Sequence, residues 1–317
     1  MSGTPTSSGS RWTGLSERIP MIIERHEDVT PAVLAVMQQT TDPRLREILT
    51  SLVSHLHAFV RDVRLTEEEF RAATAILNEM GQATTDTHNE MVLMSGSLGV
   101  STLVCLLNNG NHGATETQQN LLGPFWRMHS PRVDNGGSIV RSQTPGPALF
   151  VDARVEDQDG NPIPDAEVDV WHSSPVGLYE HQDSGQAPMN LRGKFVTDEE
   201  GRFRFRTVKM AGYPIPTDTV VGRLLKAQNR HPFRPAHLHV LIFKEGYKTV
   251  ISQVYAPDDP HIDTDVQFGV TRALIGDFRP HDEPHPADSS VQAPWYSLDY
   301  TFTMEPGMAR LPRPPIK

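Results

Sequence analysis

The chain has 317 residues and a mass of 35.3 kDa, above the length at which a single hydrophobic core usually divides, so two structural units are expected. Lys and Arg total 29 against 39 Asp and Glu, a net charge of −10, which argues against nucleic acid as a partner. The one cysteine, Cys105, permits no internal disulfide, and residues 1–16 lack the apolar core of a signal peptide. A cytoplasmic protein is therefore expected.

The first third of the chain has the apolar spacing of α-helices. Residues 1–18 are rich in Ser, Thr and Gly and are expected to be disordered. Apolar residues recur every three to four positions from Leu45 to Val63, which predicts an amphipathic helix. Thr66 followed by Glu69 is a capping box, which starts a further helix. We expect a helical domain over residues 19–126, with helices in Met21–Met37, Leu45–Val63, Thr66–Met80 and Thr87–Leu107.

The segment from Met91 to Leu107 is apolar enough to raise the question of a membrane span. No Asp, Glu, Lys or Arg occurs between Glu90 and Glu116. The apolar segment is nevertheless shorter than the stretch of about 18 or more residues that a spanning helix needs, and it contains Gly, Ser and Thr. A buried core helix with no membrane contact is therefore expected.

After residue 126 the pattern changes from helical to β. A linker rich in Pro, Gly and Ser is expected over residues 127–147, and short runs with strand periodicity follow it. These runs predict a β-sandwich over residues 148–317, with the stretch 278–294 as a solvated loop. The fold class is therefore α+β, a mainly-β sandwich with an N-terminal helical domain. The expected strands are Ala148–Val155, Ala166–His172, Gly201–Val208, Ala236–Lys244, Lys248–Tyr255 and Trp295–Met304.

Two histidines in one expected strand, His237 and His239, are the sharpest local feature. Side chains two apart in a strand point to the same face, so both imidazoles can reach one metal ion while Leu238 and Val240 pack on the other face. His55 and His57 have the same spacing, but they lie in an expected helix, where residues two apart do not face each other. By spacing alone, the first pair is either a metal site or two structurally satisfied histidines, and no metal site is expected at the second pair.

Two of the six tyrosines lie in turn-rich segments upstream of these histidines. Tyr179 follows Val176-Gly177-Leu178, and Tyr213 lies between Gly212 and Pro214. Loops at the ends of sandwich strands are where functional sites are usually built. By their own context, the two tyrosines could equally be ordinary aromatic residues at the rim of the sandwich.

Several ordered segments together resemble a known family, the intradiol ring-cleaving dioxygenases, over about residues 30–305. The resemblance implies a ferric site of two tyrosines and two histidines, here Tyr179, Tyr213, His237 and His239. It also implies that dioxygen opens the ring of a catechol-type diol between its two hydroxylated carbons. The segments that carry the resemblance are Thr115-Glu116, Leu122–Phe125, Gly160–Pro164, Val168–His172, Gly177–Tyr179, Ala211–Pro214, Arg234–His239 and Gln253.

The implied ligand set suits ferric iron. Phenolate oxygens are hard anionic donors that stabilise the oxidised metal. Three positive charges less two phenolates and one hydroxide leave a neutral site, and a dianionic catecholate can replace the hydroxide and one tyrosinate without changing the charge. The two departing ligands then each take a substrate proton. By the resemblance, Tyr213 is the tyrosinate that dissociates and Tyr179 the one that stays.

The resemblance also implies roles for residues around the iron. Arg234 would stabilise negative charge that develops on the substrate ring, and Gln253 would support the site from the next strand. A rim salt bridge is the alternative role of Arg234, and a structural amide that of Gln253. The implied pocket lining is Leu93, Gly96, Leu122, Gly123, Pro124, Phe125, Ile215 and Pro216, together with Arg234.

The expected substrate is hydroxyquinol, which would give maleylacetate, or catechol, which would give cis,cis-muconate. The segments Tyr213–Asp218 and Arg230–Pro235 are more similar to the hydroxyquinol branch. That branch tends to carry an acidic residue where this chain has Gly96, so no carboxylate is available there to accept a bond from a third hydroxyl. Catechol or a bulkier substituted diol therefore stays open.

The resemblance further implies a homodimer joined through the helices, in some members with a phospholipid between them. Two other functions stay open from the residues alone. One is a zinc hydrolase that uses His237 and His239 with a carboxylate such as Glu180 or Asp218. The other is a transthyretin-like binding module without catalysis. The loop His281–His285 contains metal-type residues, but no regular element is expected there to fix their geometry.

Overall fold

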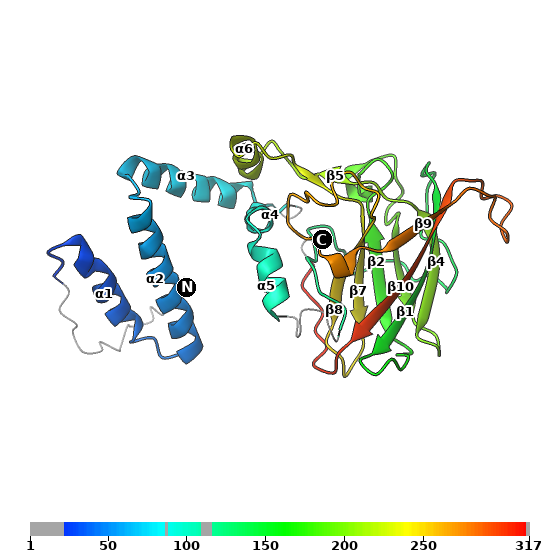
Figure 1. Cartoon of the computed structure of the whole chain (residues 1–317), viewed down its shortest axis with the longest axis horizontal. Helices are drawn as coiled ribbons and strands as arrows, with labels where there is room; N and C mark the ends of the chain where they lie inside the picture. Colours follow the sequence, from blue (N-terminus) through cyan, green and yellow to red (C-terminus); the bar gives the residue numbers. More distant parts are fainter. Residues whose placement is uncertain (1–21, 86–87, 109–115, 315–317) are drawn as a thin grey trace, which may run out of the picture. The chain divides into compact units, whose positions relative to one another are not determined.

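The computed structural model describes residues 22–85, 88–108 and 116–314. The expected disorder of residues 1–18 lies outside these ranges. By contact density the chain divides into two compact units between Ala75 and Ile76, so the last two helices before the sheets group with the sheets. Figure 1 shows the elements in chain order, and each unit is described by itself.

The first unit is a helical pair. α1 (His26–Met37) contacts α2 (Pro43–Asp62), and Asp42 caps α2 by accepting hydrogen bonds from the backbone amides of Arg44 and Leu45. α3 (Glu67–Ala83) crosses into the second unit, and its predicted capping box is confirmed by mutual bonds between Thr66 and Glu69. The amphipathic helix is also confirmed, but its apolar side chains are exposed in the single chain: Leu45, Ile48, Leu52, Leu56, Phe59 and Val63.

The prediction of one buried helix over Met91–Leu107 is wrong. The segment forms α4 (Glu90–Ser97) and α5 (Val100–Asn108), which meet at an angle of 78°. Gly99 lies between them with a positive φ of 73°, a conformation that ends a helix. No residue of α5 is fully buried, and Leu103, Val104 and Leu107 are exposed. Among the described residues no single helix could span a membrane, although this bent pair has sufficient combined length and hydropathy.

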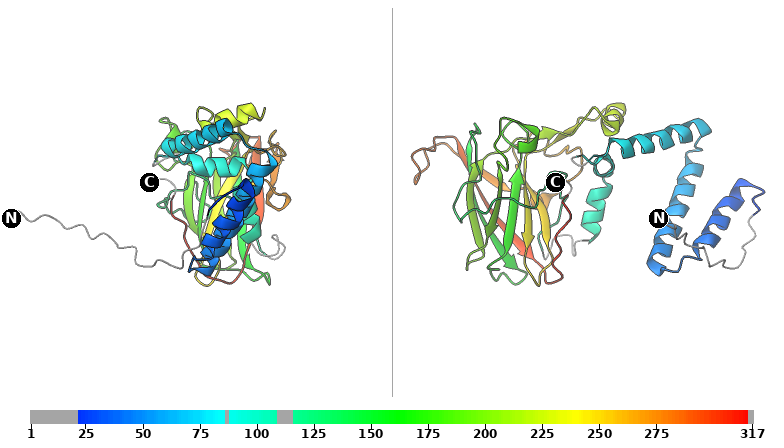
Figure 2. Two further views of the ribbon diagram at one scale, coloured as in Figure 1. Left: turned by 90° about the vertical axis from the view of Figure 1, so that its left-hand side faces the viewer. Right: turned by 180° about the vertical axis from the view of Figure 1, so that it is seen from behind.

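The predicted β-sandwich is confirmed. One sheet has the strand order β4-β1-β10-β9 and the other β3-β2-β7-β8, and β1 and β10 form the parallel pair. Figure 2 shows the two sheets packed face to face. The strands are β1 (Ala148–Asp157), β2 (Glu167–His172), β3 (Arg192–Val196), β4 (Arg202–Val208), β7 (His237–Phe243), β8 (Val250–Tyr255), β9 (Asp277–His281) and β10 (Trp295–Met304).

The core of the sandwich follows from alternation along the strands. Buried residues alternate with more exposed ones in β1, and the same alternation in the first part of β4 buries Phe203 and Phe205. These aromatic rings stack on Phe195 of β3 and Phe302 of β10, so both sheets contribute to one core. This core holds in place the sheet β3-β2-β7-β8, which carries the site described below.

Short elements outside the two main sheets complete the unit. β5 (Tyr213–Pro214) pairs with β6 (Phe233–Arg234), and α6 (Val220–Ala227) lies between them in the chain. The short 3-10 helices η1 (Glu180–Gln182) and η2 (Arg272–Leu274) follow β2 and β8. The buried carboxylate of Glu90 in α4 accepts a hydrogen bond of 2.8 Å from the backbone amide of Val221, which joins α4 to the start of α6.

The prediction of a solvated loop over residues 278–294 is wrong at its start. β9 pairs antiparallel with β10 there, and Phe278 is buried in the core between the sheets. Pro280 is compatible with this pairing because β9 is an edge strand. A proline has no backbone N–H to donate, and an edge strand has a neighbouring strand on one side only. The strand periodicity was not apparent in the sequence, because prolines and charged residues dominate the composition of this stretch.

Candidate functional site

His237 and His239 project from one face of β7, as their spacing predicts. Both imidazoles are about 1% exposed, and Leu238 and Val240 lie on the opposite face, in the core between the sheets. The two Nε2 atoms approach each other to 3.1 Å. The histidine face therefore points away from the sandwich core, and it provides one wall of a buried polar site.

Two tyrosines complete a cluster of four donor atoms. The pairing of β5 with β6 sets Tyr213 opposite Arg234, and its hydroxyl lies 3.4 Å from Nε2 of His237. Tyr179 immediately precedes η1, and its hydroxyl lies 3.5 Å from that of Tyr213. Tyr179 is 1% and Tyr213 7% exposed. The four residues that the sequence singled out are thus brought together from three separate parts of the chain.

Burial determines the charge of these groups. It lowers the pKa of His237 to about 3, with Arg234 adding to the effect, and it lowers the pKa of His239 well below its ordinary value. Burial also raises the pKa of both Tyr179 and Tyr213 above the ordinary value. The histidines are therefore neutral, and the tyrosines stay protonated unless a positive charge binds beside them.

The arrangement fits a metal ion. For bonds of about 2.1 Å, neighbouring donor atoms on a metal lie about 3.0 to 3.4 Å apart, close to the separations found in this cluster. Nδ1 of His237 donates to the carbonyl of Pro235 at 2.7 Å, so the lone pair of this ring lies on Nε2 and faces the cluster. Two neutral nitrogens and two ionisable oxygens, all buried, form a donor set that a metal cation can hold together.

Tyr179 is supported by a group of charged residues, of which the sequence singled out only Glu180, as a possible zinc ligand. The guanidinium of Arg192 lies 5.8 Å from the centre of the Tyr179 ring, and it donates to Glu180 and to the carbonyl of Phe125. Arg127 also donates to Glu180. Burial alone would raise the pKa of Glu180, but the imidazole of His181, 3.8 Å from its carboxylate, and the ion pairs with Arg192 and Arg127 hold that pKa at about 2. An ionised network therefore fixes the chain next to Tyr179.

Two further residues hold His239. Trp171 of β2 is its neighbour across the sheet and stacks on the imidazole, with ring centres 4.7 Å apart. Gly123 lies so close to the His239 imidazole that a Cβ on residue 123 would be 3.0 Å from Cε1 of the ring. Its φ of +74° is also a conformation that favours glycine. The contact between Trp171 and His239 could be predicted only from the pairing of β2 with β7, because the two residues are far apart in sequence.

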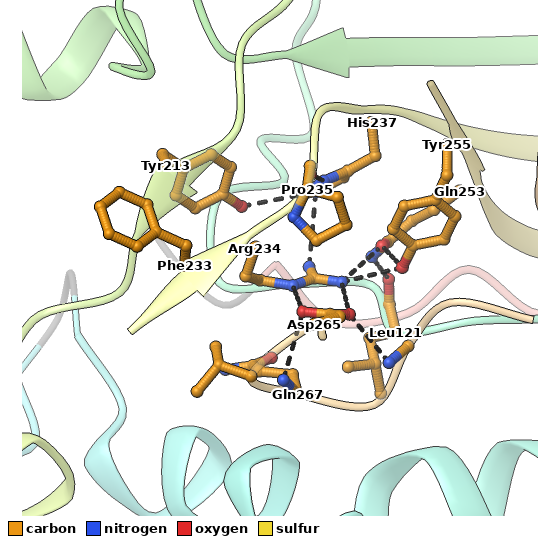
Figure 3. Close-up of polar contacts among 12 residues, drawn as sticks. Leu121, Tyr213, Phe233, Arg234, Pro235, His237, Gln253, Tyr255, Asp265 and Gln267 are labelled. Carbon is orange, nitrogen blue, oxygen red and sulfur yellow. Dashed lines mark hydrogen bonds and ion pairs between the residues drawn. The ribbon is translucent and has the colours of Figure 1, made fainter. Parts of the chain in front are cut away.

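Arg234 is the centre of a buried polar network (Figure 3). Its NH1 lies 3.4 Å from Nε2 of His237, and its other nitrogens donate to both carboxylate oxygens of Asp265 at 3.2 Å. It also donates to Gln253 and Tyr255. Burial lowers the pKa of Arg234, but Asp265 more than offsets this, so the guanidinium is charged. The sequence predicted Arg234 and Gln253 and missed Asp265 and Tyr255.

The residues expected to line the pocket come from three places. Leu93 of α4 packs with Ile215 and Val266, whereas Leu122 and Phe125 pack against the cluster that contains Trp171 and both tyrosines. Gly123 touches His239, as described above, and Pro124 lies between Gly123 and Phe125 in the same half-buried segment. Gly96 is buried against Gln267. Pro216, in contrast, is exposed.

The alternative ligands lie elsewhere. Glu180 is committed to Arg192 and Arg127, and Asp218 is exposed. In the described ranges no group of three or more His, Cys, Asp and Glu side chains could hold a metal ion, which removes the support for a zinc hydrolase. His55 and His57 lie in α2, where His57 bonds to Thr30. His281, the last residue of β9, and His285 in the following loop pack on the ring of Trp295.

Two family models match the chain. The model described as "Dioxygenase" matches residues 122–304, which include all four clustered donors, Arg234 and Gln253. The model described as "Catechol dioxygenase N terminus" matches residues 42–115. Together they cover α2 to α6 and the strands of the sandwich, but not α1.

Curated relatives and solved structures agree with these matches. A hydroxyquinol 1,2-dioxygenase of Rhizobium sp. is 40% identical over 86% of this chain and 92% of its own length. A catechol 1,2-dioxygenase of Candida albicans is 35% identical over 87% of this chain and 91% of its own. The structure of a hydroxyquinol 1,2-dioxygenase from Pseudomonas putida superposes with a TM-score of 0.81, at 34% identity, over 89% of this chain and 99% of that one. Given this similarity and the site described above, the chain belongs to the intradiol ring-cleaving dioxygenases, the family of the catechol and hydroxyquinol 1,2-dioxygenases.

Proposed function

We propose that this intradiol dioxygenase binds one ferric ion through Tyr179, Tyr213, His237 and His239. The family implies non-haem iron in general, and the donor set favours the ferric state because two phenolates are hard anionic ligands. The observation that carries the proposal is the convergence of the four donor atoms at 3.1 to 3.5 Å in a buried site. Because both phenols must ionise, binding of the metal releases protons to solvent.

The proposed reaction adds both atoms of dioxygen to a catechol-type diol and cleaves the bond between its two hydroxylated carbons. Catechol would give cis,cis-muconate, and hydroxyquinol would give maleylacetate. When bound, ferric iron draws electron density from the diol and so makes its ring reactive toward dioxygen. The residues of the chain bind the diol, receive its protons and stabilise the charge on its ring.

Tyr213 is the proposed proton acceptor. Its phenolic oxygen lies within 3.5 Å of both Tyr179 and His237, at the centre of the donor cluster. It comes from a two-residue strand next to Gly212, whereas Tyr179 is held by the Arg192 and Glu180 network. The less restrained of the two tyrosines is the better candidate to leave the metal and take a substrate proton.

Arg234 is the proposed stabiliser of negative charge on the ring. It is 3% exposed, and Asp265 keeps it charged while NH1 faces the donor cluster. A fixed cation in a buried site acts on developing charge without solvent reorganisation. Gln253 donates through Nε2 to the carbonyl of Leu121 and accepts from Arg234 through Oε1. It therefore orients the guanidinium and is a positioning residue for the reaction.

The ring of the diol is proposed to lie against the apolar side chains of Leu93, Leu122, Phe125 and Ile215. Gly96, Gly123 and Pro124 would complete the lining, with Arg234 as its charged member. Pro216 would lie at the mouth of the pocket, because it is exposed. An apolar lining with few fixed polar groups is typical of a pocket for a small aromatic ligand.

Two statements about assembly are also proposals. We infer a homodimer formed through the helices, because α2 exposes a row of apolar side chains, including Leu52 at 57% and Leu56 at 53%, which a partner would cover. A phospholipid between those helices would be covered by the same apolar surface. A cytoplasmic location is a prediction from the sequence.

Isotope labelling tests the reaction. The iron-loaded chain would be incubated with catechol or hydroxyquinol under 18O2, and the product identified by mass spectrometry. We expect a ring-opened diacid that carries both labelled oxygen atoms. No ring-opened product from either diol, or a product with only one labelled atom, would contradict the proposal.

A further inference from the structure

The side-chain amide of Gln267 occupies the space that a side chain at position 96 would fill. Gly96 is buried in α4, and a Cβ built there would lie 2.9 Å from both Cδ and Oε1 of Gln267 and 3.3 Å from Nε2. Real Cβ contacts are almost never that short, so the amide group takes this position only because residue 96 has no side chain. The chain thus replaces a side chain from the helix with an amide from a distant loop.

The position of Gln267 is adjacent to the proposed ring pocket. Leu93, one helical turn before Gly96 on the same face of α4, packs with Ile215 and with Val266, the residue before Gln267. The backbone amide of Gln267 donates to Asp265, the partner of Arg234. Figure 3 shows Gln267 on the same side of Arg234 as Asp265, with Tyr213 and His237 on the other side. The side-chain amide, which contacts Gly96, therefore lies against α4, the helix from which Leu93 projects.

The side-chain amide of Gln267 is available for a hydrogen bond with a ligand. The backbone of Gln267 is fixed at both ends, since its N–H donates to Asp265 and its carbonyl accepts from Thr102 at 3.2 Å. Its side chain, in contrast, has no hydrogen bond to any residue in the ranges 22–85, 88–108 and 116–314. The nearby lining residues Leu93, Ile215 and Val266 are apolar. An amide can donate to and accept from one hydroxyl, so it suits a phenolic group on a ring.

We propose that Gln267 determines the substituent specificity of the enzyme by binding a third hydroxyl on the substrate ring, which makes a benzenetriol a better substrate than catechol. The inference rests on the proposed function and deepens it. A site that hydrogen-bonds a substrate hydroxyl discriminates against the analogue without it, because its polar group then loses that partner. Gly96 contributes to the same specificity, because its lack of a side chain leaves space for this amide.

Kinetics of a substituted glutamine test the inference. Gln267→Leu removes the amide at similar size, and Gln158→Leu, at an exposed residue of the turn after β1, is the matched control. In the iron-loaded full chain, we expect Gln267→Leu to lower kcat/KM for hydroxyquinol about tenfold, the value of one buried hydrogen bond, and for catechol less than about twofold. The Kd for hydroxyquinol, from anaerobic titration of the visible absorption band, should rise by a similar factor, and the Kd for catechol should rise less than about twofold. Gln158→Leu should change neither.

A second variant keeps the test decisive if Gln267→Leu does not fold. Gly96→Ala adds the Cβ that would displace the amide and should lower the same ratio of hydroxyquinol to catechol. An unchanged ratio in the variants that retain iron, or a wild-type preference for catechol, would overturn the inference. A wild-type protein that cleaves neither diol would instead contradict the proposed function, so the two failures are distinct.

Discussion

Trp171 lies flat against the imidazole of His239, with the two ring planes within 8° of each other. Both residues are buried, and they are directly opposite in the register of β2 and β7. Nδ1 of His239 has no hydrogen-bond partner among the residues that the structure describes, whereas Nδ1 of His237 is bonded to Pro235. The indole therefore orients His239 by stacking, where the other histidine is oriented by a hydrogen bond.

Replacing Trp171 tests this orienting role. Trp171→Leu removes the flat surface and leaves a cavity, so we expect about 3 kcal/mol less stability and weaker binding of iron. Trp171→Phe keeps a ring against His239 and serves as the control, with a smaller loss of iron. The measurements are urea unfolding and the iron content of the purified protein under a competing chelator. Equal iron loss in the two variants would contradict an orienting role of the stacked ring.

The pair of Arg234 and Asp265 makes a prediction about stability. Both side chains are at most 3% exposed, so removal of one charge leaves the other buried and uncompensated. We expect Arg234→Met to destabilise the protein by about 3 to 5 kcal/mol and to abolish ring cleavage. Thermal and urea unfolding measure the first effect, and oxygen consumption with a diol measures the second.

A double variant separates the two roles of Arg234. Arg234→Met combined with Asp265→Asn removes both charges of this pair, and it should recover a substantial part of the stability without recovering activity. If activity returned together with stability, Arg234 would act only through the fold, and its proposed role on the substrate ring would be wrong.

Asp169 makes the stability depend on pH. Burial raises its pKa from 3.8 to about 6, although Lys194 opposes the shift from 3.6 Å. Because the folded carboxyl holds its proton more tightly than the unfolded one, its contribution to stability is fully present below about pH 4. It is lost as the pH rises through 6, by about 3 kcal/mol in total. His172 has the opposite effect, because burial lowers its pKa to about 4.

The two effects are separated by a difference measurement. Asp169→Asn removes the acidic group, so the stability of this variant relative to wild type should rise between pH 4 and pH 7. Asp134→Asn, at an exposed carboxylate, is the control and should show no such rise. Urea unfolding at several pH values provides the numbers. A constant difference between Asp169→Asn and wild type across this range would show that the carboxyl titrates normally.

Substitution of the donors themselves tests the ligand assignment. Tyr179→Phe and His239→Ala should each remove iron, because each takes one donor from a cluster of four. His55→Ala and His57→Ala, with the same spacing in a helix, should leave the iron content unchanged. Metal analysis of the purified variants is the readout, and similar loss from both pairs would refute the argument from strand geometry.

The local part of this site was predictable from the sequence, because strand periodicity alone puts His237 and His239 on one face. Tyr179 and Tyr213 required more, since only the family resemblance singled them out from ordinary rim aromatics. The same holds for Arg234 and Gln253, whose alternatives were structural roles.

The rest depends on strand pairing and on loops that return from far along the chain. Asp265 approaches Arg234 from the loop after β8, and Trp171 meets His239 through the order β2-β7, which no local pattern specifies. The prediction of burial for the helices was wrong for a different reason. An apolar composition predicted burial for Leu103 and Leu107, yet both are exposed in the single chain. Periodicity shows which face is apolar but not what covers it.

The most direct test of the ferric site is the visible absorption spectrum of the purified protein, before and after anaerobic addition of catechol or hydroxyquinol. Tyrosinate ligands on ferric iron give a burgundy charge-transfer band, and the account predicts such a band, its loss in Tyr179→Phe and a shift to longer wavelength when the diol binds. A colourless protein that contains no iron by metal analysis after loading with iron would contradict the account.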